Sequence, residues 1–193
     1  MFFLSKLEHK LRVPPHKLDL PIEESITDEL QSIFLDKIIS KLGLCVSVYD
    51  ILSIDGGFVL PDNGAPTYTV VFRMIMFRPY IGEIIEGKLL ESDTKGVRLS
   101  LGFFEDIYVP SYALQQPAHL VPDPERPKEK FWTWMHEDEE DFRVEGDEIR
   151  FRVTSVDYPT IPLEQDEGSK PFAPMVVIGE MNMEGLGPAS WWV

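Results

Sequence analysis

Closely spaced short strands, separated by glycine and turn residues, fill the second half of the chain and constrain its fold more than any other feature. Residues 81–114 read IGEIIEGKLLESDTKGVRLSLGFFEDIYVPSYAL, which predicts three successive strands with a turn at 93–96 and an end at Pro110. The block GDEIRFRVTSVD at 146–157 and the run at 175–181 predict two more strands. Short strands in this order are typical of a closed Greek-key barrel.

The residues before this barrel predict a separate unit that combines a helix with strands. The expected elements are a strand at 1–13, a helix from Pro21 to about Leu42 that ends at Gly43, and strands at 44–54 and 68–77. In the strand at 44–54 we expect Leu44, Val46 and Val48 to share one face, because side chains alternate along a strand.

The predicted fold class is α+β, in two domains. We expect an N-terminal domain at residues 1–79, similar to a truncated RNP fold, and a C-terminal OB-fold, a five-stranded barrel, at residues 80–193. Prolines in the segment at 115–127 predict that it is extended or irregular, and a short strand follows at 131–134. The acidic run at 137–141 predicts a solvated loop.

The composition favours a globular protein, and its acidic charge fits a component of a larger assembly and a merely soluble protein equally well. Apolar residues make up 44% of the 193 residues, which is enough for a packed core. The formal net charge of −15 disfavours a free-standing nucleic-acid-binding protein, because such proteins neutralise phosphates with a positive surface. No run approaches the roughly 20 apolar residues of a membrane span, so we expect no membrane association.

Catalytic chemistry finds little support in the sequence. The single cysteine, Cys45, lies in an apolar run and is expected to be a core residue rather than a nucleophile. The four histidines are scattered, and no glycine-rich phosphate loop is present. We therefore expect a non-catalytic protein with no cofactor and no metal site.

Four stretches, together with the order of the expected elements, carry a resemblance to a known family. They are LRVPP at 11–15, GLCVSVYDI at 43–51, SLGFFEDIYVP at 100–110 and GLGPASWW at 185–192. With these stretches the chain resembles the larger stalk subunits of eukaryotic and archaeal RNA polymerases, and it is most similar to those of RNA polymerase III. The barrel resembles the S-one class of RNA-binding domains.

The resemblance implies a non-catalytic subunit of a nuclear DNA-directed RNA polymerase. Such a subunit forms a heterodimer with a smaller helical stalk subunit, docks on the RNA polymerase core, supports initiation and lies close to the nascent single-stranded RNA. Two alternatives stay open at this point. One is the equivalent stalk subunit of another nuclear polymerase, and the other is an independent RNA-binding factor with an OB-fold barrel.

Two sets of candidate site residues follow. The residues favoured for weak RNA binding are Lys88, Arg98, Tyr108, Arg150 and Arg152. Cations beside a stacking ring suit single-stranded RNA, although the same arginines also fit an ordinary solvated sheet face. The resemblance places the core-docking tip at two expected turns, formed by Asp55, Gly56 and Gly57 and by Pro61, Asp62, Asn63 and Gly64. The residues alone favour plain hairpin connections.

Overall fold

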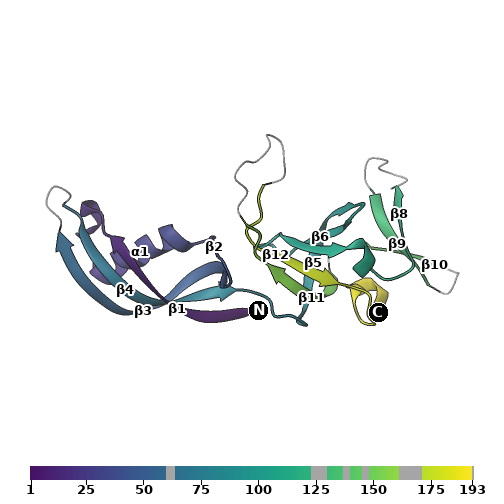
Figure 1. Ribbon diagram of the computed structural model, residues 1–193, viewed down its shortest axis with the longest axis horizontal. Coiled ribbons are helices and arrows are strands. Elements are labelled where there is room, and N and C mark those ends of the chain that lie inside the picture. The colour runs from purple at the N-terminus through teal and green to yellow at the C-terminus, as the bar shows by residue number, and fades with distance from the viewer. Residues whose placement is uncertain (60–63, 123–129, 137–139, 145–147, 161–170, 193) are drawn as a thin grey trace. The chain divides into compact units, whose positions relative to one another are not determined.

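The computed structural model describes residues 1–59, 64–122, 130–136, 140–144, 148–160 and 171–192 (Figure 1). The chain divides into two compact units, Met1–Arg78 and Pro79–Val193. Strands dominate both units, and α1 (Ile22–Phe34) is the one α-helix among the described residues. Within these residues no helix has the length and apolar character needed to cross a membrane.

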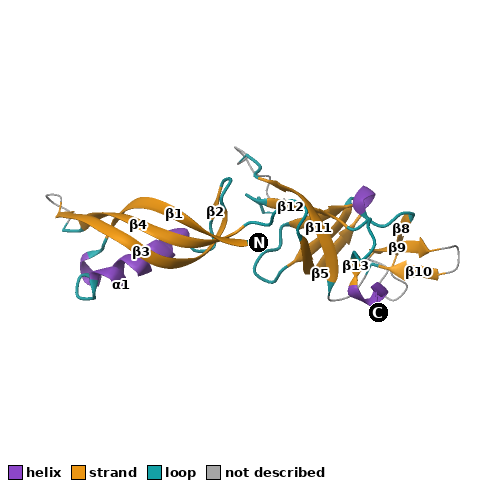
Figure 2. Ribbon diagram, turned by 90° about the horizontal axis from the view of Figure 1, so that it is seen from below, coloured by secondary structure: helices purple, strands orange, loops and turns teal. Residues whose placement is uncertain are grey.

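The N-terminal unit is an antiparallel sheet with a helix on one face. Its strands are β1 (Phe2–Arg12), β2 (Ile38–Ile39), β3 (Gly43–Val59) and β4 (Pro66–Phe77), in the spatial order β1-β4-β3-β2. Helix α1 runs along one face of this sheet (Figures 1 and 2). Its Ile26 and Leu30 are fully buried against Val70, Phe72 and Met74 of β4. The opposite face has no helix among the described elements.

Helix α1 is shorter than the periodicity of the sequence predicts. Its N-terminus agrees with expectation, since Pro21 precedes it and acidic side chains occupy its first turn. The predicted end at Gly43 is wrong, because Leu35 is extended and Asp36 takes a positive φ of 58°. Residues 38–39 then pair with residues 43–44 in a tight hairpin. Apolar residues whose spacing suggested a continued helix therefore form the short strand β2.

Strand β3 packs with a period of three residues rather than two. The residues that face α1 are Cys45, Val48, Ile51 and Ile54, which oppose Met76, Met74, Phe72 and Val70 of β4. Register shifts at 45/47, 48/50 and 51/53 insert one extra residue into each interval. The expectation that Leu44, Val46 and Val48 share a face is therefore wrong. Val46 occupies a bulge, and Leu44 and Val48 lie on opposite faces because they pair with Phe77 and Met74 of β4.

The C-terminal unit contains the expected five-stranded barrel. Its strands are β5 (Ile84–Asp93), β6 (Gly96–Ser100), β7 (Ile107–Pro110), β11 (Ile149–Asp157) and β12 (Val176–Glu180). Neighbouring strands pair in the order β12-β7-β6-β5-β11, and an additional β11–β12 pairing closes the barrel. The β7–β12 pair is parallel and the other pairs are antiparallel. Alternate side chains of each strand, such as Phe151 and Val153, fill the interior.

A small sheet lies between β7 and β11, where the sequence predicts an extended or irregular segment and a short strand, and the strand expected at 131–134 is confirmed. Strands β8 (Ala118–Pro122), β9 (Lys130–His136) and β10 (Glu140–Arg143) pair as antiparallel neighbours. The proline-rich segment therefore supplies a strand, and it does so at an edge, where proline costs no ladder hydrogen bond. Of the expected acidic loop, residues 137–139 lie outside the described residues, and residues 140–141 begin β10.

Aromatic side chains attach this sheet to the barrel and to the C-terminal segment. The indole Nε1 of Trp132 donates a hydrogen bond of 3.0 Å to the Asp93 carbonyl oxygen. The ring of Trp134 packs 5.3 Å, centroid to centroid, from Trp191 in the 3₁₀ turn η3 (Ala189–Trp192). A short strand, β13 (Gly187–Pro188), connects the same segment to β11. The Trp191 indole is thus a packing residue of this unit.

Barrel closure predicts contrasting effects for two glycines with positive φ. A Cβ on Gly96 would lie 2.1 Å from the Val109 carbonyl oxygen, whereas a Cβ on Gly102 would meet nothing within 4 Å. Gly96→Ala forces strands β6 and β7 apart, and we expect it to lower the free energy of unfolding by about 3 kcal/mol or more. Gly102→Ala should cost only about 1 kcal/mol. Urea denaturation of both variants is the measurement, and equal losses would contradict the described β6–β7 packing.

Candidate nucleic-acid and docking surfaces

The arginines expected to bind RNA lie on the outer surface of the barrel. Arg150 and Arg152 alternate along β11 with the buried side chains of Ile149, Phe151 and Val153. Arg98 of β6 is half-buried and directly opposes Tyr108 of β7. Strand alternation therefore gives these side chains the outward direction that the sequence predicts.

Each of these three arginines is paired with a carboxylate of a neighbouring strand or loop. The Nε of Arg150 donates to Glu86 Oε1 at 2.7 Å, and the Nε of Arg152 donates to Glu180 Oε1 at 2.5 Å. Arg98 donates from Nη2 to Asp106 Oδ1 at 3.2 Å and from Nε to the Glu105 carbonyl oxygen at 3.0 Å. Two of the acids directly oppose their arginines across the sheet. The guanidinium charges are thus largely balanced within the barrel wall.

Tyr108 lines an acidic hollow of about 410 Å³, shared with Arg98, Glu91, Asp93, Glu105 and Asp106. Burial, and then the nearby Asp93 carboxylate, raises the pKa of Tyr108 to about 12, and its hydroxyl lies 3.5 Å from Asp93 Oδ1. Arg98 is the one cation among the described residues that line it. The hollow therefore repels a phosphate, despite the ring that it offers.

The five candidate RNA-binding residues do not form one cluster. Arg98 and Tyr108 share the acidic hollow, whereas Lys88 lines a different one with Glu86 and Glu148. The arginines of β11 lie across β5 from Arg98. Sequence reasoning missed the acidic partners, because nothing in a single strand shows which carboxylate the barrel will place opposite an arginine.

The first expected docking turn is instead part of a strand. Asp55, Gly56 and Gly57 lie within β3, where Asp55 opposes Thr69 and Gly56 opposes Tyr68 of β4. Both glycines have positive φ, 106° and 89°. The turn prediction is wrong because the positive-φ glycines form a bulge within the ladder rather than reversing the chain.

The second expected docking turn lies largely outside the described residues, which exclude Pro61, Asp62 and Asn63. Gly64 is described and exposed, with a φ of 61°. A Cβ placed on it would lie 3.9 Å from Pro15 Cγ, in the 3₁₀ turn η1 (Pro15–Lys17).

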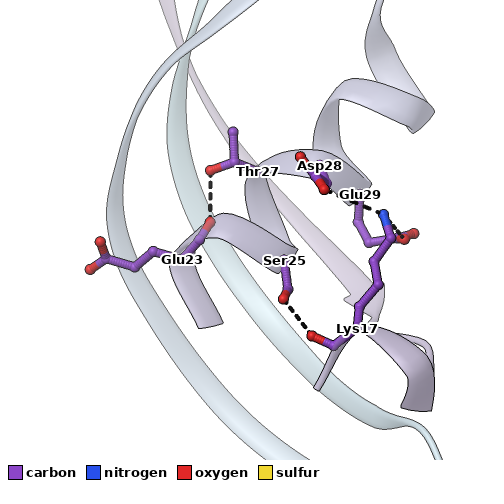
Figure 3. A network of polar contacts seen from close by, with 6 residues as sticks. All are labelled: Lys17, Glu23, Ser25, Thr27, Asp28 and Glu29. Atoms are coloured by element: carbon purple, nitrogen blue, oxygen red, sulfur yellow. Dashed lines mark hydrogen bonds and ion pairs between the residues drawn. The ribbon is translucent and has the colours of Figure 1, made fainter. Parts of the chain in front are cut away.

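Turn η1 is fastened to helix α1 by polar contacts (Figure 3). The buried hydroxyl of Ser25 donates a 2.6 Å hydrogen bond to the Lys17 carbonyl oxygen. The Lys17 ammonium lies 3.0 Å from Glu29 Oε1 and 3.8 Å from Asp28 Oδ2. These contacts hold the end of turn η1 against the helix and leave Lys17 charge-balanced.

Cys45 is a core residue, as its apolar surroundings in the sequence predict. Its side chain is fully buried among the β3–β4 core, and burial raises the pKa of the thiol to about 11. The thiol is therefore protonated at neutral pH, and the thiolate that nucleophilic chemistry requires is not formed.

Because the barrel arginines are ion-paired, removing one of the paired carboxylates should leave the positive charge of its arginine free to attract RNA phosphates. Glu180→Gln removes the carboxylate that balances Arg152, so affinity for single-stranded oligouridine should rise, by about threefold to tenfold at low salt. Glu184→Gln is the matched control, since it removes the same charge from an exposed turn with no arginine partner among the described residues. Fluorescence anisotropy measures both, and equal changes would show that net charge alone decides.

Two family models match the chain, in the order of its two units. The model described as "SHS2 domain found in N terminus of Rpb7p/Rpc25p/MJ0397" matches residues 8–64. The model described as "RNA polymerase III subunit Rpc25" matches residues 83–192, which is more than half of the chain.

Whole-length relatives agree with these models. The DNA-directed RNA polymerase III subunit RPC8 of Bos taurus is 34% identical over 100% of this chain and 98% of its own length. The subunits of the same name from Schizosaccharomyces pombe and Saccharomyces cerevisiae are 30% and 31% identical, over 100% of this chain and of their own lengths. The resemblance in the sequence is confirmed, and the chain belongs to the RNA polymerase III subunit Rpc25 family.

Proposed function

We propose that this chain is the larger, non-catalytic stalk subunit of the nuclear DNA-directed RNA polymerase III and supports transcription initiation. The observation that carries the proposal is the end-to-end correspondence with relatives named as subunits of that polymerase. The order of an SHS2 unit and an OB-like barrel supports it, because both family models refer to polymerase subunits.

In this function the N-terminal domain, residues 1–79, docks on the polymerase core, and the C-terminal domain, residues 80–193, contacts RNA. The open face of the N-terminal sheet supports docking, since apolar side chains on β1 and β3 are exposed there. They include Phe2, Leu4 and Phe58. Exposed apolar groups on one sheet face are typical of a surface that a partner covers.

The barrel's contact with nascent RNA is proposed to be weak and dependent on salt. Lys88 is exposed, and the arginines of β6 and β11 are balanced by acids, so few cations are left for phosphates. This charge balance also disfavours the alternative of an independent RNA-binding factor. Membership of the polymerase III family disfavours a stalk subunit of another nuclear polymerase.

The proposal predicts a one-to-one complex with a smaller helical subunit. Co-expression with the smaller stalk subunit of the same source should raise the thermal midpoint of the chain by several degrees, because a partner that binds only the folded state stabilises it. Differential scanning calorimetry and light scattering measure this, with an unrelated helical protein of similar size as the control.

Affinity purification tests assembly with the polymerase. The tagged full-length chain, purified from nuclear extract, should bring down the large catalytic subunits of RNA polymerase III in proportion to the chain. Recovery of the chain without any polymerase subunit, or with another nuclear polymerase, would refute the proposal.

A further inference from the structure

A hollow of about 410 Å³ lies on the open face of the N-terminal sheet, away from α1. Two alternate rungs of the sheet, on either side of the rung that contains Tyr68, form it. They are Lys10, Thr69 and Asp55 on one, and Arg12, Thr67 and Phe58 on the other. The even-numbered residues of β4, such as Val70 and Phe72, face the helix. Thr67 and Thr69 therefore point to the opposite face, and so do the residues that pair with them.

The glycine bulge in β3 brings Phe58 to this hollow. Gly56 opposes Tyr68, the next residue is extra, and Phe58 opposes Thr67. Without the extra residue, alternation would direct Phe58 to the helix-covered face. Its ring is instead 77% exposed and lines the hollow. The bulge therefore places a large apolar surface where the core does not use it.

The polar groups of the hollow lack partners that would satisfy them. Lys10 and Arg12 are exposed and form no ion pair with any residue that the structure describes. The Thr67 hydroxyl oxygen is buried and makes no hydrogen bond to any residue in the described part of the chain. Among the described residues, Asp55 balances at most one of the two cations, so one positive charge and one hydroxyl donor have no described partner beside Phe58. A buried donor without a partner is costly until a ligand satisfies it.

The charge distribution of the chain directs an anionic ligand to this unit. Residues 1–78 carry eight Lys and Arg against ten Asp and Glu, a formal charge of −2, whereas residues 79–193 carry ten against 23, a charge of −13. An anion is thus repelled far more strongly by the C-terminal unit than by the N-terminal one.

We propose that this hollow binds a segment of the polymerase core in which an aspartate or glutamate lies beside an apolar side chain. The carboxylate accepts hydrogen bonds from the Arg12 guanidinium and, after rotation of the Thr67 side chain about χ1 toward the hollow, from the Thr67 hydroxyl, and the apolar side chain packs on the Phe58 ring. This inference rests on the proposed function, because it names the chemistry of the core surface on which the N-terminal domain docks.

A polypeptide fits the surroundings of the hollow better than RNA does. A nucleic-acid strand needs cations in series along its backbone. On the exposed face of β1, however, Glu8 separates Lys6 from Lys10, and Asp55 lies on the β3 side. Further along the sheet, Arg73 is bound through Nε to Asp50 Oδ1 at 2.7 Å, so it offers no free charge.

The test compares three variants of the full-length chain, co-expressed with the smaller stalk subunit. Arg12→Glu reverses the unpaired charge, and Thr67→Val removes only the hydroxyl. Lys6→Glu is the matched control, since it makes the same kind of charge reversal on the exposed face of the same strand but outside the hollow. Binding to purified RNA polymerase III core enzyme without its stalk is measured by biolayer interferometry, and thermal midpoints are measured in parallel.

Arg12→Glu should weaken binding to the core at least about tenfold, and Lys6→Glu by no more than about twofold. Thr67→Val should also weaken binding while the thermal midpoint stays equal or rises, because the variant removes a buried hydroxyl that has no partner in the free chain. A structural role for Thr67 would instead lower the midpoint.

Other results overturn the inference in distinguishable ways. If the unmodified complex does not bind the core, the proposed function itself fails. If it binds, and both hollow variants bind as tightly as Lys6→Glu, the hollow is not used. If the hollow variants lose affinity for single-stranded oligouridine but keep their affinity for the core, the occupant is nucleic acid and the proposal is wrong.

Discussion

The bulged ladder between β3 and β4 is the constraint on which the N-terminal unit depends. Strand β3 has 17 residues and its partner has 12, and register shifts take up part of the surplus. The first three shifts convert a period of two into a period of three, so that four apolar residues of β3 reach the core beneath α1. The last shift, at the glycine pair, directs Phe58 to the other face. The register shifts thus build the core at one end of the strand and expose an apolar side chain on the open face at the other.

The barrel shows a different arrangement, in which outward-facing arginines are balanced by carboxylates of neighbouring strands and loops. Its outward arginines would attract RNA, but Asp106, Glu86 and Glu180 are placed within hydrogen-bonding distance of them. Such half-exposed pairs contribute little to stability, about 0–1 kcal/mol each. Their main effect is on the electrostatic field, because they hold the wall of the barrel close to neutral where the sequence shows isolated cations. A weak contact with a passing transcript is compatible with this balance, whereas tight binding is not.

The sequence was sufficient for the barrel, because its strands are short, contain alternating apolar and polar stretches such as residues 149–153, and are separated by glycine, proline and turn residues. It was insufficient where a residue's role depends on a partner strand. Ile38 and Ile39 fit a helical period, but Asp36 breaks the helix and they pair with residues 43–44. The spacing of Cys45, Val48 and Ile51 carried the signal for the bulges, but it is recognisable only once β4 supplies the opposing register. Lys10, Arg12 and Thr67 come from segments that only the sheet brings together.

Hydrogen–deuterium exchange on the full-length heterodimer, free and assembled with the polymerase core, tests most directly whether the N-terminal sheet is the docking element. Strand β1 is an edge strand, and β3 beyond residue 44 pairs with β4 alone among the described strands, so both present backbone amides that a partner can protect. The account predicts slower exchange on assembly at residues 8–12 and 55–59 and unchanged exchange in β6 and β11. Protection confined to the barrel strands, with the N-terminal sheet unchanged, would contradict it.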